Sequence, residues 1–171
     1  MSSKTLERST RLVLMALRQE QDVVLCRNRA RAIAAALQFD RQCQVRIATA
    51  VSEIARNAFR YGQEATVEFS IHRGRTGDDS HVAPSFVTVV RDKGPGIEDL
   101  PSILAGTYQP GTGLGMGILG AKRLMNVVDI ETGSNGTTVR LAQKLPTGVE
   151  YNSLDLRSIA EETSRRCRRC V

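Results

Sequence analysis

The change of hydrophobic period near Gly62 constrains the fold of this chain more than any other feature. Before it, apolar residues repeat at helical spacing and form one stripe: Val45, Ile47, Ala48, Val51, Ile54, Ala55, Ala58 and Phe59. Asp40 can cap this helix, because its carboxylate accepts the unpaired N–H groups of a first turn, and Gly62 can end it. After it, apolar and polar residues alternate, which predicts a half-buried strand with an inner face of Ala65, Val67, Phe69 and Ile71.

The remaining segments add further helices and strands. An apolar run at 12–17 predicts a strand, and Asp22 is expected to cap a helix over 22–38. Runs bounded by turn residues predict three more strands, at 86–90, 127–132 and 137–145. The segment 98–114 contains two prolines and several glycines, which predicts a loop, and a buried helix is expected over 116–125.

This order of elements indicates the fold class. Helices followed by mostly hairpin-linked strands, without regular strand–helix alternation, predict an α+β fold. We expect a two-layer α/β sandwich, with the helices on one face of a mixed, mainly antiparallel sheet.

Length and composition indicate one soluble globular domain, since 41% of the 171 residues are apolar and 25% are charged. We expect that domain over 1–146. Residues 147–171 contain few large apolar side chains and predict a tail or linker, with a helix near 154–163. No segment approaches the roughly 18 consecutive apolar residues of a membrane span. The N-terminus lacks an apolar signal core, so we expect a cytoplasmic protein without membrane contact.

The formal net charge of +6 raises the question of nucleic-acid binding. Most arginines of the helical segments are interleaved with alanines, and no RNA-binding aromatic motif accompanies them. The pattern favours a solvated basic surface over a nucleic-acid interface. Such a surface suits an acidic protein partner or a nucleotide.

The four cysteines fall into two groups. Cys26 and Cys43 lie in helical patterns, where cysteine usually serves as a small buried residue. Cys167 and Cys170 form a C-x-x-C pair, but the sequence has no second such pair to complete a zinc site. We interpret them as surface thiols, and leave open a redox pair or a metal half-site shared between chains.

Glu53 and Asn57 are four residues apart on the helix that follows Asp40, so they share one face. A carboxylate can take a proton from a nucleophile, and a carboxamide oxygen can ligate Mg²⁺. Alone, such a pair usually marks a solvated helix face. The apolar residues beside it place this face near the core instead.

Two glycine-containing segments follow. In the first, Asp92 ends an apolar strand and precedes Gly94 and Gly96, so it can present a hydrogen-bond acceptor to an adenine amino group. A plain turn explains these residues equally well. The second, 111–120, leads into the helical segment 121–125, and its backbone N–H groups can converge on phosphate oxygens. It lacks the Gly-Lys-Ser/Thr of the common P-loop, and a dinucleotide fingerprint fits it poorly.

The order and spacing of these three elements resemble the N-box and glycine boxes of the GHKL superfamily, over about residues 11–145. Within that superfamily the chain is most similar to RsbT-type anti-sigma regulatory serine/threonine kinases, and next to the RsbW and SpoIIAB type. The similarity lies in Ile47-Ala-Thr-Ala-Val-Ser-Glu-Ile-Ala-Arg-Asn57 and in Gly113-Leu-Gly-Met-Gly-Ile-Leu-Gly-Ala-Lys-Arg-Leu-Met125. One residue departs from it, because Tyr61 stands where relatives often carry a histidine.

The resemblance implies a Bergerat fold that binds Mg²⁺ and ATP beneath a lid at 98–115. It implies that Glu53 is the general base, that Asn57 is the magnesium ligand and that Asp92 anchors adenine. The nucleotide-binding residues that it implies are Asn57, Asp92, Gly94, Gly96, Ile97, Gly111, Thr112, Gly113, Leu114, Gly115, Met116, Gly117, Thr137 and Thr138.

The function implied by the resemblance is an ATP-dependent serine/threonine protein kinase that phosphorylates a STAS-domain antagonist in a bacterial partner-switching pathway. A PPM-type phosphatase or a sigma factor are further implied partners, and a homodimer is left open. The alternative is an anti-sigma factor or ATP-gated module that acts by sequestering a partner. A histidine kinase with its own phosphoacceptor is disfavoured, because the only histidines, His72 and His81, flank a predicted hairpin loop.

Overall fold

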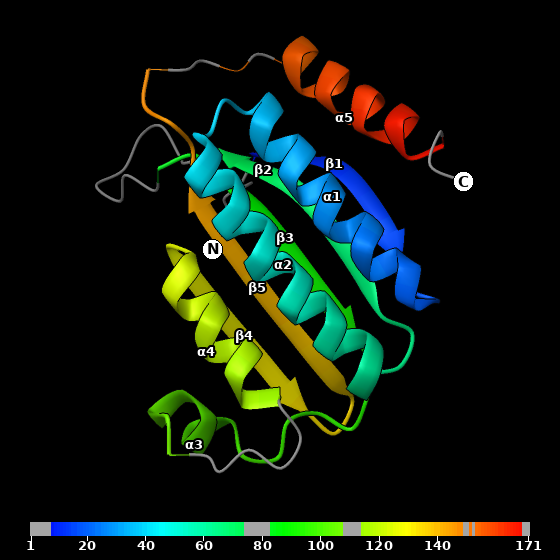
Figure 1. The fold of residues 1–171 in the computed structure, drawn as a ribbon, viewed down its shortest axis with the longest axis vertical. Coiled ribbons are helices and arrows are strands. Elements are labelled where there is room, and N and C mark those ends of the chain that lie inside the picture. The colour runs from blue at the N-terminus through cyan, green and yellow to red at the C-terminus, as the bar shows by residue number, and fades with distance from the viewer. Residues whose placement is uncertain (1–7, 74–82, 108–113, 149–150, 152, 169–171) are drawn as a thin grey trace, which may run out of the picture.

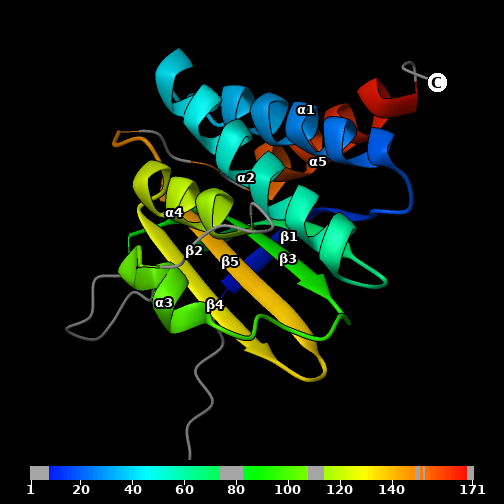
Figure 2. The ribbon, with the colours of Figure 1, turned by 60° about the horizontal axis from the view of Figure 1, so that its bottom comes forward.

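The computed structural model describes residues 8–73, 83–107, 114–148, 151 and 153–168. Its elements, in chain order, are β1 (Arg8–Ala16), α1 (Glu20–Ala36), α2 (Arg41–Tyr61), β2 (Thr66–Arg73), β3 (Ser85–Asp92), α3 (Leu100–Ala105), α4 (Leu114–Leu124), β4 (Val127–Gly133), β5 (Gly136–Lys144) and α5 (Ser153–Arg168). The strands form one sheet, and α1, α2 and α4 lie across one of its faces (Figures 1 and 2). The α+β sandwich expected from the sequence is therefore confirmed.

The sheet has the strand order β1-β2-β3-β5-β4, and each neighbouring pair is antiparallel. Among the described strands it is thus antiparallel throughout, where the sequence predicted a mixed, mainly antiparallel sheet. The connectivity explains the difference. The segment with α3 and α4 carries the chain past β3 to the edge strand β4, and a tight turn then returns β5 into the gap between β3 and β4.

The core lies between the sheet and the helices. The inner face of β2 is as predicted, because Ala65, Val67, Phe69 and Ile71 are all buried. Phe69 stacks on Phe86 of β3, with 6.1 Å between the ring centroids and 18° between the planes. Such aromatic pairs contribute about 0.5–1.5 kcal/mol beyond the burial of their area.

Helix α2 begins and ends where its sequence indicates. The Asp40 carboxylate accepts the N–H of Cys43 at 2.8 Å, and Gly62 follows the last helical residue. The residues of the helix that point into the core are Ile47, Ala48, Ala50, Val51, Ser52, Ile54, Ala55 and Ala58. This burial fixes the rotation of α2, and therefore the face that carries Glu53 and Asn57.

Helix α1 begins earlier than predicted. Gln19, and not Asp22, is its N-cap residue, and Asp22 lies in the first turn. The Asp22 carboxylate accepts the backbone N–H groups of Arg18 and Gln19, at 2.8 and 3.0 Å. An aspartate stabilises a helix start from either position, because both place its charge beside unpaired N–H groups.

The segment predicted as a loop at 98–114 contains the short helix α3. Asp99 caps it by accepting the N–H of Ser102 at 3.3 Å, and Gly106 ends it with a left-handed φ of 72°. Pro101 lies in its first turn, where a proline is tolerated because the missing N–H would have no helical partner. Pro101 and Gly106, which indicated a loop, therefore lie in the first turn and at the end of a helix instead.

Helix α5 packs against α1 and β1 (Figure 1). Leu156, Ile159 and Thr163 are its buried residues, and the Thr163 hydroxyl donates to the Ile159 carbonyl at 2.7 Å. The preceding Tyr151 donates its hydroxyl to the Leu37 carbonyl at the end of α1. The sequence predicted helix within 147–171, and the structure adds that this helix covers part of the core. Where the domain ends stays a prediction.

We predict that Leu156→Ala lowers the free energy of unfolding by about 2–5 kcal/mol, because it leaves a cavity at a fully buried position. Chemical denaturation followed by circular dichroism measures this change. Ser158→Ala, at an exposed position of the same helix, should change the free energy by less than about 0.5 kcal/mol. A loss equally small for Leu156→Ala would mean that α5 unfolds separately from the domain.

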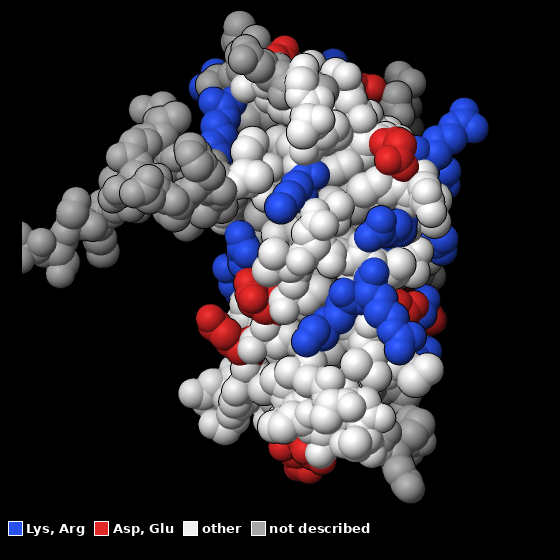
Figure 3. Space-filling view, turned by 90° about the vertical axis from the view of Figure 1, so that its left-hand side faces the viewer, with Lys and Arg blue, Asp and Glu red and all other residues white. Residues whose placement is uncertain are grey.

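Charged side chains on the face that carries α4 and β4 occur in several separate groups. Figure 3 shows lysines and arginines divided by uncharged surface and by acidic side chains. One acidic neighbour is Asp129 of β4, whose carboxylate lies 3.4 Å from the Arg140 guanidinium of β5. This face therefore lacks one continuous basic stripe among its described residues.

The cysteine in α1 behaves as expected for a buried thiol. Cys26 is fully buried, and burial raises the pKa of its thiol to about 12, so it stays protonated and unreactive at neutral pH. Cys43 is half-buried. The C-x-x-C pair lies partly outside the described residues. No helix in the described part of the chain is both long and apolar enough to cross a membrane.

Candidate nucleotide-binding site

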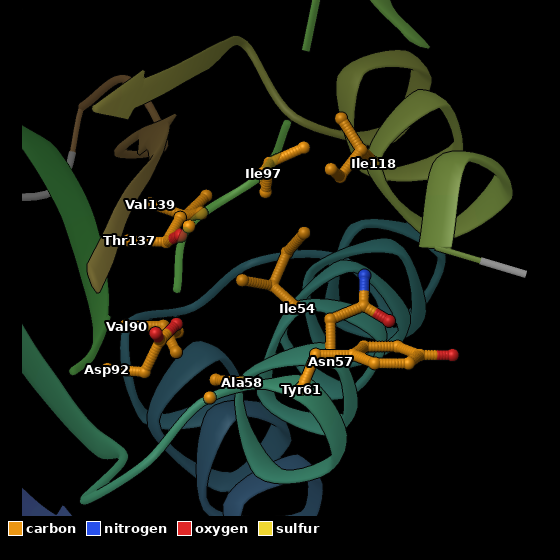
Figure 4. A pocket seen from close by; sticks show the side chains of 12 residues that line it. Ile54, Asn57, Ala58, Tyr61, Val90, Asp92, Ile97, Ile118, Thr137 and Val139 are labelled. Atoms are coloured by element: carbon orange, nitrogen blue, oxygen red, sulfur yellow. The ribbon is translucent and has the colours of Figure 1, made fainter. Parts of the chain in front are cut away.

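A pocket opens between the C-terminal half of α2, the ends of β3 and β5, and α4 (Figure 4). Its walls are mainly apolar, and a few polar groups converge in it. The residues that line it are Ile54, Asn57, Ala58, Tyr61, Gly62, Val90, Asp92, Gly96, Ile97, Ile118, Thr137 and Val139. Mainly apolar walls with a few placed polar groups are typical of a small-molecule site.

Asp92 is the acidic group of this pocket. One of its carboxylate oxygens accepts the N–H of Gly94 at 2.8 Å, which fixes the carboxylate and leaves its other oxygen for a ligand. Asp92 and Thr137 are direct partners on the neighbouring strands β3 and β5. Both residues line the pocket, so an acceptor and a hydroxyl stand side by side on one wall.

The backbone is crowded around Asp92. A Cβ atom at Gly62 would lie 2.4 Å from the Asp92 Cβ, and one at Gly136 would lie 2.0 Å from the Asp92 carbonyl oxygen. At Gly96 the φ angle is 85°, and a Cβ would lie 2.3 Å from the Gly133 carbonyl oxygen. Glycine is therefore required at Gly96 by both conformation and space. The end of α2, the loop after β3 and the β4–β5 turn are packed backbone to backbone here.

Glu53 and Asn57 lie on the face of α2 that meets α4. A Cβ at Gly117 of α4 would lie 3.2 Å from Asn57 Nδ2 and 3.4 Å from Glu53 Oε2. Gly117 thus lets α4 approach the two side chains closely. The other oxygen of Glu53 accepts from the Arg56 guanidinium at 3.0 Å, and the Glu53 side chain is 37% exposed, so the carboxylate is open to a reactant.

The two ends of α4 differ in their surroundings. At its C-terminal end, the Arg46 guanidinium of α2 donates to the Leu124 carbonyl at 2.8 Å. At the other end, α4 begins at Leu114, and Gly117 at the end of its first turn lies close to Asn57. Because a helix N-terminus carries unpaired N–H groups and a partial positive charge, this end of the site suits an anion.

Most of the residues expected at a nucleotide site come together here. Asn57, Asp92, Gly96, Ile97 and Thr137 line the pocket, while Gly94, Gly117 and Glu53 adjoin it. Met116 is 68% exposed, and Thr138 follows Thr137 on β5 and so faces the opposite side of the sheet. Gly111, Thr112 and Gly113 lie outside the described residues.

Sequence reasoning missed the apolar walls and one hydroxyl. Ile54, Val90, Ile118 and Val139 are pocket residues that sequence patterns assign simply to the core. Thr132 of β4 accepts the N–H of Ile97 at 2.8 Å and lies 3.0 Å from the Thr137 hydroxyl. Only the pairing register of β4 and β5 identifies Thr132, because it makes this residue the direct partner of Thr137.

The site therefore joins two kinds of recognition. Apolar walls with Asp92 and Thr137 suit a flat heterocycle that carries a hydrogen-bond donor, and the N-terminal end of α4 suits phosphate groups. Residues 15–143 match the family model described as the histidine kinase-like ATPase domain. The chain belongs to this family.

This chain is similar to two known proteins. It is 32% identical over 124 residues to the serine/threonine-protein kinase RsbT of Bacillus subtilis (strain 168), and the match covers 71% of this chain and 87% of RsbT. Among solved structures, it resembles the histidine kinase domain of a blue-light activated histidine kinase from Erythrobacter litoralis. That match has 17% identity and a TM-score of 0.42, and it covers 70% of this chain and 52% of the solved one.

Proposed function

We propose that this protein is an ATP-dependent serine/threonine protein kinase. The observation that carries the proposal is the placement of two pairs of side chains around one pocket. Asp92 and Thr137 offer an acceptor and a hydroxyl, which suit adenine, and Glu53 and Asn57 offer a carboxylate and a carboxamide. The similarity to RsbT supports the choice of serine or threonine as the acceptor.

In this proposal the base of ATP lies between the apolar walls, and its amino group donates to the free oxygen of Asp92. The phosphates extend toward the N-terminal end of α4. Glu53 takes the proton of the acceptor hydroxyl while that oxygen bonds to the γ-phosphorus. The bond from the γ-phosphorus to its bridging oxygen breaks, and ADP leaves.

The residues around Asn57 fit a magnesium ion that arrives with the nucleotide. Asn57 Nδ2 is buried and has no hydrogen-bond partner among the described residues. Because a half-turn of the carboxamide exchanges its two ends, the oxygen can take this place as a ligand. In the described part of the chain no three His, Cys, Asp or Glu side chains form a metal site. Phosphate oxygens and water would therefore supply most ligands, as is usual for Mg²⁺, and the ion would neutralise phosphate charge.

The protein substrate that we propose is a STAS-domain antagonist, with a PPM-type phosphatase or a sigma factor as further partners. This part of the proposal rests on the resemblance to RsbT-type kinases. A base that acts on a hydroxyl of another protein must be reachable from outside, and the partly exposed Glu53 side chain meets this requirement.

The test is to incubate the protein with ATP, Mg²⁺ and a candidate STAS-domain protein, and to map modified residues by mass spectrometry. Phosphoserine or phosphothreonine is the expected result, and its absence when the STAS-domain serines and threonines are replaced by alanine is the control. Stable ATP-dependent binding of a partner without phosphate transfer would contradict the kinase and support sequestration.

A further inference from the structure

Three polar side chains form a row across the sheet at the pocket. They are Asp92 of β3, Thr137 of β5 and Thr132 of β4, and each is the direct cross-strand partner of the next. Direct partners in an antiparallel pair have Cβ atoms about 4.5–5.5 Å apart and face the same side of the sheet. Asp92 and Thr137 line the pocket, whereas Thr132 does not.

A chain of hydrogen bonds runs along the outer part of this row. The backbone N–H of Ile97 donates to the Thr132 hydroxyl oxygen at 2.8 Å, and the hydroxyl oxygens of Thr132 and Thr137 are 3.0 Å apart. Among the described residues, neither hydroxyl has another hydrogen-bond partner within reach. One of the two O–H protons therefore forms the hydrogen bond between the hydroxyls. The other O–H proton has no acceptor among the described residues.

The geometry alone allows either hydroxyl to donate, and the fixed donor at Ile97 favours one of the two directions. An N–H can only donate, so Ile97 occupies a lone pair of the Thr132 oxygen and makes the Thr132 O–H a better donor. In the favoured direction Thr132 donates to Thr137. The remaining proton is that of Thr137, which is 8% exposed and lines the pocket. In this arrangement the Thr137 O–H is available as a donor to whatever the pocket holds.

We propose that Thr132 is a positioning residue for base specificity: it orients the Thr137 hydroxyl as a donor, and the pocket thereby selects purines with an acceptor at ring position 1. The inference rests on the proposed ATP-binding function and deepens it. It assigns to Thr132, which does not line the pocket, part of the choice between adenine and guanine.

The chemistry of the two purines explains this selection. Adenine presents a 6-amino donor next to an N1 acceptor, whereas guanine presents a 6-oxo acceptor next to an N1–H donor. The Asp92 carboxylate and the donating Thr137 hydroxyl match adenine at both positions. Guanine would place its 6-oxo acceptor against the Asp92 carboxylate, and its N1–H could pair with Thr137 only if that hydroxyl turned its proton away. A site with unmatched polar groups discriminates strongly.

The test compares ATP with 1-deaza-ATP, in which a C–H replaces the N1 acceptor, by calorimetric titration. Thr132→Val keeps the shape of the side chain and removes its hydroxyl, so we expect ATP binding to weaken about tenfold. Thr132→Ser keeps the hydroxyl and should bind ATP within about twofold of the wild type. For 1-deaza-ATP, the wild type and Thr132→Val should bind equally, because the interaction under test is already absent.

The outcomes separate this inference from the proposed function. Equal weakening of both ligands by Thr132→Val would mean that Thr132 only supports the loop at Ile97, and it would overturn the inference, as would unchanged ATP binding. Failure of the wild type to bind ATP would overturn the proposed function, and the inference with it. Thermal unfolding of each variant checks the fold, and Thr132→Ala provides a second hydroxyl-free variant should Thr132→Val not fold.

Discussion

Asp92→Asn is expected to weaken ATP binding at least about 100-fold while the protein remains folded. One oxygen of Asp92 accepts the Gly94 N–H, and the proposal assigns the other to the adenine amino group. An asparagine has only one acceptor atom, so it must leave one of these two donors unpaired. Its amide nitrogen would also place a donor against a donor. Calorimetric titration with ATP measures the loss.

The matched control is Asp129→Asn. Asp129 lies on β4, its side chain is 61% exposed and it contacts Arg140. The substitution makes the same chemical change outside the pocket, so ATP affinity should stay within about twofold, since exposed ion pairs contribute little. Unchanged ATP binding by Asp92→Asn would rule out the carboxylate as the adenine anchor.

Glu53→Gln is expected to lower phosphate transfer by about 10²–10⁴-fold and to leave ATP affinity nearly unchanged. Glutamine keeps the size of the side chain but cannot take the proton of the acceptor hydroxyl. Separate assays are therefore needed, one for nucleotide binding and one for phosphate transfer to the STAS-domain protein. Normal transfer by this variant would contradict the role of Glu53 as the general base.

Glu53 also accepts from Arg56 within α2, so the loss of an ion pair must be separated from the loss of the base. Arg56→Gln provides this control, because it removes the ion pair and keeps the Glu53 carboxylate. The control variant should transfer phosphate at the wild-type rate.

Features set by residues close in sequence were predictable. Asp40 and Gly62 mark the two ends of α2, and both were predictable because a helix cap depends only on residues next to it in sequence. The alternation from Ala65 to Ile71 predicted the inner face of β2. Asp22 was less informative, since an aspartate stabilises the first turn of a helix from more than one position. Pro101 was ambiguous for a similar reason, because it is common both in loops and in first turns.

Features set by the pairing of distant segments were not predictable. The sequence singled out Glu53, Asn57 and Asp92 by spacing and by resemblance, but it offered no signal for Thr132. That residue matters only because the register of β4, β5 and β3 aligns it with Thr137 and Asp92. The antiparallel sheet likewise follows from the return of β5 between β3 and β4, which spacing along the chain does not encode.

The crowding of backbone around Asp92 has a consequence for the thermodynamics of recognition. Gly62, Gly96 and Gly136 let three segments meet without side chains of their own between them. The position of the Asp92 carboxylate is therefore fixed by the fold before any ligand binds. In the proposed complex, the base at this end of the pocket meets a preorganised surface, so little conformational entropy is lost there on binding. We infer that affinity at the base-binding end depends on the match of hydrogen bonds more than on ordering of the protein.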